Sequence, residues 1–378
     1  MTLRVGKLVY GIIKLLPCLL AVLLASSCSS DVNSDEQKGN KTLVTLTIAA
    51  SGNAATASRA VSGNSSTITR ASASVSDPTN KDYYISDLTV LIFDESGDVI
   101  GSTTKQASDL TLSSDGKFTI KVLTRAAQNC TVYAIANALA LNGGNTPFAG
   151  IATLSALKSM VKPYTNADDI NTETCLLMMG KTADNSFDTT NSGSAAAISL
   201  QRLASKIDFK FTVNDDQTTG FPIVVDSYQL CNVPASTLYQ QSDFTNNPSM
   251  PLGSTSTSKY QSQGSITSSA AGKHETYTCY VYTNTDASNK TYLLINAHSA
   301  VTGSDGSTTY KVWNSVFRVK MPDVVKPNMH YTVNITIKGS ANTSGVGGVI
   351  TTYNAYPYFS GSTLNPWQSE TDRNLDLQ

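Results

Sequence analysis

Residues 41–50, KTLVTLTIAA, alternate in hydrophobicity along their whole length. Val44, Leu46 and Ile48 fall on one face of an extended backbone, and threonines occupy most of the other face. A period of two residues with β-branched side chains predicts a β-strand that is buried on one face only. The same alternation recurs along the chain, which predicts a β-sheet protein.

The composition of the chain agrees with that prediction. Its 378 residues are 40% hydrophobic and 15% charged, a balance that favours short strands and turns over long helices. The length suggests about two domains of ordinary size. The formal net charge is -1 and no basic stripe is present, so we expect no nucleic-acid partner.

Two hairpins and a strand follow the first strand. Residues 83–100 contain turn residues at 94–97, and residues 110–123 contain turn residues at 115–116. The largely apolar segment 130–140 then predicts a further strand. The acidic turn at 94–97 lacks the spacing and distal glutamate of a helix-loop calcium site, so we interpret it as a turn.

A helix and a polar loop separate these strands from a second series. Leu154, Leu157 and Val161 have helical spacing and predict a short amphipathic helix, and the polar residues 182–194 predict a loop. The second series starts at 198–213, includes a long Ser/Thr-rich loop at 246–267, and continues at 276–284, 291–300, 310–321 and 329–339. The expected fold class is all-β with a short helix, arranged as two tandem antiparallel β-sandwiches.

The first residues of the chain form a targeting segment. Basic residues precede an apolar run at 15–24 that is too short to span a bilayer, and the run ends at LLASSC, residues 23–28. This pattern resembles a bacterial lipoprotein signal, in which Cys28 becomes the acylated N-terminus. An ordinary secretory signal that is cleaved nearby is the alternative.

Cysteines and catalytic motifs provide little evidence for chemistry. Cys130, Cys175, Cys231 and Cys279 have no CxxC spacing, and both disulfides and buried free thiols remain open. The three histidines lack metal-ligand spacing, and neither GxSxG nor GxGxxG occurs. We therefore expect no metal, no cofactor and no enzymatic activity.

The segment after the first strand is unusual in its charges. Between Lys41 and Asp77 the only charged side chains are Arg59 and Arg70, surrounded by small neutral residues. Such an extended segment suits cleavage by a trypsin-like protease. The alternative is that both arginines are ordinary solubilising charges.

The C-terminal tail follows a glycine-rich linker, GSANTSGVGG, at 339–348. It carries apolar residues that a complete core would not need, among them Leu364, Trp367, Leu375 and Leu377. These four side chains are candidates for filling a groove in another molecule. The alternative is that the tail folds back as an edge strand of its own second domain.

Five motifs, taken in order, resemble the fimbrillin family, the subunits of type V pili of Bacteroidetes-type bacteria. They are LTIAASGNAATASRAV, ISDLTVLIFDESGDVI, LQRLASKIDFKFTV, KPNMHYTVNITIKG and LNPWQSETDRNLDL. The resemblance implies transthyretin-like domains and assembly by strand exchange. In that scheme an Arg-specific protease cuts at Arg59, with Arg70 as the fallback, and releases the strand bearing Val44, Leu46 and Ile48.

The resemblance also implies a domain organisation, partners and a location. The organisation is a signal peptide (1–27), a lipidated propeptide (28–59), an N-terminal sandwich (60–197), a C-terminal sandwich (198–340), and a linker with donor strands (341–378). Expected partners are further copies of the chain, anchor and tip subunits, the protease, and the outer membrane through the lipid. The precursor would be lipid-anchored in the cell outer membrane, and the product would be an extracellular adhesive fimbrium.

Loss of the first strand is expected to leave a sheet edge and an apolar slot, which a sibling's tail would fill. Alternatives are an anchor, tip or accessory pilin of the same family, or a monomeric glycan-binding surface lipoprotein using Trp313 or tyrosines. Trp313 lies in an alternating strand pattern, which predicts a core position instead.

Overall fold

A computed structural model describes most of the chain between residues 41 and 355. The described residues are 41–49, 77–112, 117–165, 167, 169–188, 194–213, 223–240, 257–258, 266–267, 273–286, 288–302, 309–321, 324–337 and 348–355. All of them belong to one compact unit, Asn40–Gln378.

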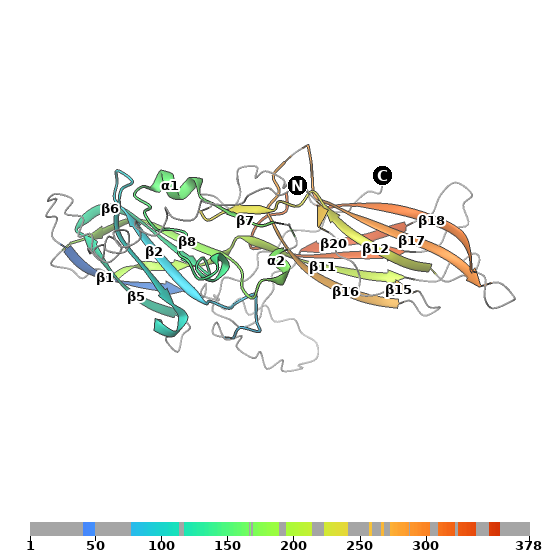
Figure 1. The fold of residues 1–378 in the computed structure, drawn as a ribbon, viewed down its shortest axis with the longest axis horizontal. Coiled ribbons are helices and arrows are strands. Elements are labelled where there is room, and N and C mark those ends of the chain that lie inside the picture. Colours follow the sequence, from blue (N-terminus) through green and yellow to red (C-terminus); the bar gives the residue numbers. More distant parts are fainter. Residues whose placement is uncertain are drawn as a thin grey trace, which may run out of the picture. The chain divides into compact units, whose positions relative to one another are not determined.

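The largest sheet has nine strands in the order β10-β8-β6-β2-β3-β5-β1-β9, with β4 paired to β5 (Figure 1). Residues 94–98 connect β2 to its neighbour β3 in the predicted hairpin, where Gly97 N donates to Asp94 O. The strands are β1 (Lys41–Ala49), β2 (Asp87–Phe93), β3 (Val99–Gln106), β4 (Thr111–Leu112), β5 (Lys117–Arg125), β6 (Ala127–Ala136), β8 (Met178–Phe187), β9 (Ser194–Ser199) and β10 (Gln201–Arg202).

The other sheets are formed mainly by the second strand series. One has the order β16-β11-β19-β20, one has the order β14-β12-β17-β18 with β15 also on β12, and one pairs β13 with β7. Their strands are β7 (Val161–Pro163), β11 (Ala204–Val213), β12 (Ile223–Cys231), β13 (Ser236–Leu238), β14 (Thr257–Ser258), β15 (Ile266–Thr267), β16 (Lys273–Tyr282), β17 (Tyr292–Thr302), β18 (Thr309–Lys320), β19 (His330–Ile337) and β20 (Gly348–Ala355).

The all-β prediction is confirmed, and helices are short. They are α1 (Leu154–Ser159), α2 (Asp169–Thr172) and two 3-10 turns, η1 (Ala107–Asp109) and η2 (Ala140–Asn142). Most strand pairs are antiparallel, but β1 with β9 and β11 with β19 are parallel, which the sequence did not predict. No helix among the described residues has the length and hydrophobicity needed to cross a membrane.

Two local predictions are wrong. Val161 does not belong to the amphipathic helix, because α1 ends at Ser159 and Val161 begins β7 with its side chain exposed. Residues 182–187 are not loop, because β8 continues to Phe187, whose buried ring ends the strand. Polar residues on the exposed face of β8 concealed the strand from pattern analysis.

Buried apolar side chains form two clusters. The first packs residues of the nine-stranded sheet together with Leu157 of α1, and the second packs residues of β11, β12, β16, β17 and β19. Cys130, Cys175, Cys231 and Cys279 are all free and buried, so the thiol alternative holds. Burial raises the pKa of Cys130 to about 11, with Asp94 adding to the shift, so this thiol stays protonated at neutral pH.

Candidate assembly site

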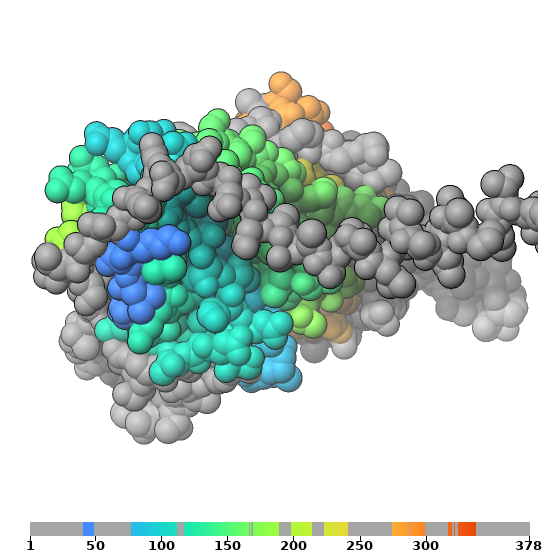
Figure 2. Space-filling model, turned by 60° about the vertical axis from the view of Figure 1, so that its left-hand side comes forward, coloured from blue at the N-terminus to red at the C-terminus, as the bar shows by residue number. Residues whose placement is uncertain are grey.

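β1 lies between β5 and β9 and reaches the molecular surface, where Figure 2 shows it in blue. It pairs antiparallel with β5 at every residue, from Lys41 opposite Arg125 to Ala49 opposite Lys117. On its other side it pairs in parallel with β9, with a register shift between Leu46 and Ile48. The backbone of β1 is therefore hydrogen-bonded along both edges.

The side chains of β1 alternate as the sequence predicted. Val44, Leu46 and Ile48 are fully buried in the first apolar cluster. Thr42 is also buried at the start of the strand, and its Oγ1 donates a 3.0 Å hydrogen bond to the carbonyl oxygen of Asp188. Burying a large aliphatic side chain contributes about 1.5–3 kcal/mol, so the three inward residues hold β1 firmly.

The strands on either side of β1 depend on it for their own pairing. β5 pairs with β3 only at Gly101 opposite Thr124, and with β4 only at two positions. Among the described residues, β9 has no ladder partner besides β1. Loss of β1 would therefore leave a slot with two open backbone edges, one on β5 and one on β9.

The strands around the slot approach one another closely at two glycines, one in β3 and one in β8. A Cβ atom added to Gly101 would lie 2.7 Å from Thr124 Cβ and 2.9 Å from the carbonyl oxygen of Leu123. A side chain at Gly180 of β8 would collide with the carbonyl oxygen of Ser199 at the end of β9. Glycine at these two positions therefore permits the packing of the strands that surround β1.

A second region, which we call the Arg202 cluster, consists of Arg202, Asp82, Lys206, Tyr280 and Asn328. Arg202 is 1% exposed, and its Nε donates to the carbonyl oxygen of Asp82 at 2.6 Å. Its Nη1 donates to Asn328 Oδ1 at 3.2 Å. The Asp82 carboxylate accepts from Lys206 Nζ and from the Tyr280 hydroxyl, both at 2.7 Å.

The Arg202 cluster joins segments that are distant in the sequence. Asp82 precedes β2, Lys206 lies in β11, Tyr280 lies in β16, and Asn328 precedes β19. Burial lowers the pKa of Arg202 and raises that of Tyr280, while the Asp82 charge opposes the first shift and adds to the second. Sequence reasoning missed this cluster, although an arginine between Leu200 and Leu203 in a strand pattern was an available signal.

Several predicted site residues lie outside the described residues. They are Cys28, Arg59, Arg70, Leu364, Trp367, Leu375 and Leu377. Within the tail, Gly348–Ala355 forms β20 at the edge of a sheet beside β19, so the fold-back alternative holds for this part. Trp313 lies in β18, and its side chain is not among those described.

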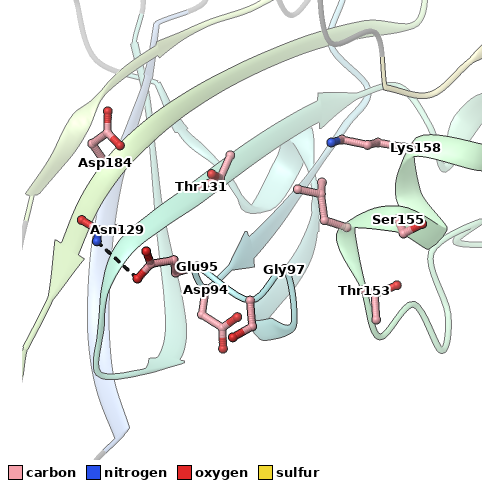
Figure 3. A pocket seen from close by; sticks show the side chains of 11 residues that line it. Asp94, Glu95, Gly97, Asn129, Thr131, Thr153, Ser155, Lys158 and Asp184 are labelled. Atoms are coloured by element: carbon pink, nitrogen blue, oxygen red, sulfur yellow. Dashed lines mark hydrogen bonds between the residues drawn. The ribbon is translucent and has the colours of Figure 1, made fainter.

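The acidic turn after β2 lines a surface pocket with residues of β6, β8 and α1 (Figure 3). Asn129 Nδ2 donates to Glu95 Oε2 at 3.4 Å, and Arg125 Nη2 meets Asp94 Oδ2 at 3.4 Å. Within the described residues, no group of three or more His, Cys, Asp or Glu side chains is placed to hold a metal ion. The turn interpretation of residues 94–97 is confirmed by the β2–β3 pairing.

The chain has an all-β fold in which an N-terminal strand lies inside its own sheet, and solved structures with a similar fold include three from Bacteroides and Parabacteroides species. A candidate cell adhesion protein from Bacteroides eggerthii is 19% identical, with 89% of this chain and 94% of that chain covered and a TM-score of 0.51. One from Parabacteroides distasonis is 15% identical, covering 89% and 96%, with a TM-score of 0.54. A fimbrial assembly protein from Parabacteroides distasonis is 14% identical, covering 83% and 95%, with a TM-score of 0.50.

The sequence family is more specific than the fold. Residues 44–223, somewhat less than half of the chain, match the family described as "Major fimbrial subunit protein (FimA)". The resemblance to fimbrillins predicted from the sequence is confirmed. The comparison with curated proteins gives no match. The match indicates a fimbrial subunit protein.

Proposed function

We propose that this chain is a structural fimbrial subunit that is exported as a lipoprotein acylated at Cys28. Proteolysis at Arg59 releases β1, and a strand from a sibling subunit replaces it. Other partners are the anchor and tip subunits of the same fimbrium and the Arg-specific protease. Before cleavage the lipid holds the precursor in the outer membrane.

The observation that carries this proposal is the position of β1 in the sheet. β1 supplies most of the ladder of β5 and places three fully buried side chains in the core. Its covalent link to β2 runs through residues 50–86, where the only basic side chains before Asp77 are Arg59 and Arg70. A cut there would separate β1 from the body without breaking any other strand that the structure describes.

The vacant slot would favour a replacement strand for physical reasons. Both β5 and β9 would present unpaired backbone groups, and an apolar trough would lie where Val44, Leu46 and Ile48 had been. An incoming strand restores ladder bonds worth about 0.5–1.5 kcal/mol each and buries apolar side chains again. As long as β1 fills the slot, premature assembly is blocked.

The cleavage step is tested with the secreted form of the precursor and an Arg-specific protease. We expect Arg59→Ala to remain uncut near β1 and to stay monomeric, whereas the matched variant Arg70→Ala is processed and forms ladders that resist mild SDS. If Arg70→Ala blocks processing and Arg59→Ala does not, the cleavage site is Arg70. If neither variant alters processing or assembly, the scheme is overturned.

Lipidation and the donor tail need separate tests. Cys28→Ala is expected to abolish palmitate incorporation and release the precursor from the outer membrane, with Cys18→Ala as the control. Deletion of residues 364–378 is expected to leave a folded subunit that caps filaments and does not extend them. Filaments of normal length from the truncated chain would exclude this tail as the donor.

A further inference from the structure

The outward face of β5 beside β1 is rich in basic side chains. Lys117, Lys121 and Arg125 alternate along it, separated by Thr119 and Leu123. Lys121 is exposed, and Leu123 is 55% exposed. Arg125 Nη2 lies 3.4 Å from Asp94 Oδ2, and the Arg125 side chain is one-third exposed.

β1 does not complement these charges. Its only charged residue, Lys41, lies directly opposite Arg125, so two cations face each other across the strand pair. Thr45 lies opposite Lys121, and Ala49 lies opposite Lys117. Like charges in directly opposed positions destabilise a strand pair. The outward face of β1 therefore lacks the carboxylates that β5 could pair with.

The C-terminal tail has the missing charges in the required alternation. In residues 370–377, ETDRNLDL, Leu375 and Leu377 share one parity with Thr371 and Arg373, whereas Glu370, Asp372 and Asp376 share the other. In an extended strand these two sets point to opposite faces. A strand that buries the two leucines in the slot consequently presents its carboxylates outward, where the basic residues of β5 lie.

We infer that β5 selects the acidic C-terminal segment 370–377 of a second copy by charge, and that charge sets its register. The inference rests on the proposed function. With the strand running in the direction of β1, Leu375 takes the place of Val44 and Leu377 that of Leu46. Asp376 then lies opposite Lys121, and Asp372 lies opposite Arg125, in the positions that Thr45 and Lys41 occupy in the precursor.

The competing register is a slip by two residues, because a slip by one would turn the leucines to solvent. In the slipped register Leu375 replaces Leu46, and Glu370 lies opposite Arg125. Asp376 then faces Thr119 and Asp372 faces Leu123, so one ion pair remains where the first register has two. The first register is therefore electrostatically favoured. Both ion pairs are solvent-exposed, so each contributes modestly and weakens with salt.

A labelled peptide of residues 364–378 tests this inference by fluorescence anisotropy with the processed subunit, whose own residues 364–378 are deleted to keep it monomeric. Asp372→Asn with Asp376→Asn is expected to weaken binding about three- to tenfold at low salt. Glu370→Gln is the matched control and should change affinity by less than about twofold. In the slipped register Glu370→Gln would weaken binding and Asp376→Asn would not.

Protein variants test the same pairs in assembly. Lys121→Glu should slow filament growth about three- to tenfold, and Asp376→Lys in the same chain should restore it. Lys105→Glu, on the exposed part of β3, is the charge-matched control. In addition, Lys121→Cys with Asp376→Cys should give disulfide-linked ladders, whereas Lys121→Cys with Asn374→Cys, the slipped register, should not.

The outcomes separate the two proposals. If the unmodified peptide does not bind and no filaments form, the proposed function itself is overturned. If peptide and filaments behave as strand exchange requires but no charge variant has an effect, the selection by charge is overturned and the proposed function remains.

Discussion

The β1 slot and the Arg202 cluster both join distant parts of the chain, but they do so by different physical means. β1 is held by backbone ladder bonds and by three aliphatic side chains. The Arg202 cluster is held by specific hydrogen bonds of Arg202, Asp82, Lys206, Tyr280 and Asn328. Any strand with the right parity reproduces the first set of contacts, whereas the second set depends on each side chain.

This difference suggests which part of the molecule is made to be exchanged. The backbone hydrogen bonds of a ladder do not depend on side-chain identity, so another strand can replace β1 between β5 and β9. A buried charged network loses much of its stability when one member is removed, because the remaining charges stay buried without compensation. The Arg202 cluster therefore anchors the segment around Asp82, just downstream of the two arginines, whereas β1, upstream of them, is the strand that would leave in the proposed exchange.

The largest expected effect is in the Arg202 cluster. Asp82→Ala removes the carboxylate that meets Lys206, whose side chain is 14% exposed, and is expected to reduce the free energy of unfolding by about 3–5 kcal/mol. Urea unfolding of the precursor measures this change. Asp109→Ala, at an exposed position in η1, is the control and should be nearly neutral. A loss below about 1 kcal/mol would show that the cluster does not anchor this segment.

The next effect concerns β1 and depends on processing. Leu46→Ala removes a fully buried side chain and is expected to destabilise the precursor by about 2–4 kcal/mol. Thr45→Ala, on the outward face, should cost much less. After processing, both variants should behave as the unmodified chain, because β1 has left. A persistent difference in the processed protein would mean that β1 stays bound.

A smaller effect is expected where β3 meets β5. Gly101→Ala places a methyl group against Thr124 and the Leu123 carbonyl and should destabilise the precursor by about 1–3 kcal/mol. The neighbouring exposed position provides a control in Ser102→Ala. Thermal unfolding followed by circular dichroism distinguishes the two variants. Equal melting temperatures for the two variants would show that β3 and β5 accommodate the added methyl group without a loss of stability.

The smallest effect is a pH dependence beside the Arg202 cluster. Burial lowers the pKa of Lys81 to about 8, against the opposing influence of Glu173, and its Nζ donates to the Ile170 carbonyl. Between about pH 8 and the ordinary lysine pKa near 10.4, the unfolded chain binds more protons than the folded chain at this site. Stability should therefore rise with pH in this window, by at most about 1.4 kcal/mol per pH unit.

Lys81→Met is the variant that isolates this contribution. Urea unfolding at intervals from pH 7 to 9.5 should show a rise in the unmodified protein that is reduced in Lys81→Met. Lys158→Met, on α1, is the control for loss of a surface charge. Identical pH profiles for Lys81→Met and the unmodified protein would contradict a lowered pKa at this lysine.

Local patterns in the sequence determined the strand character and the buried face of β1. Val44, Leu46 and Ile48 repeat every second residue, and the alternation of side chains in a strand depends only on local geometry. The β2–β3 hairpin was predictable for the same reason, since Asp94 and Gly97 are turn residues. The family resemblance also came from residues in order along the chain.

Tertiary structure alone decided which strands flank β1, where Arg202 is buried, and that β8 continues through polar residues. These features depend on contacts between residues far apart in the sequence, some of them by more than a hundred positions, such as Arg202 with Asp82 and Thr42 with Asp188. The local pattern of hydrophobicity does not identify contact partners that are distant in the sequence. The sequence by itself therefore determined the strands and the faces they bury, whereas the fold decided which neighbours those faces and edges would meet.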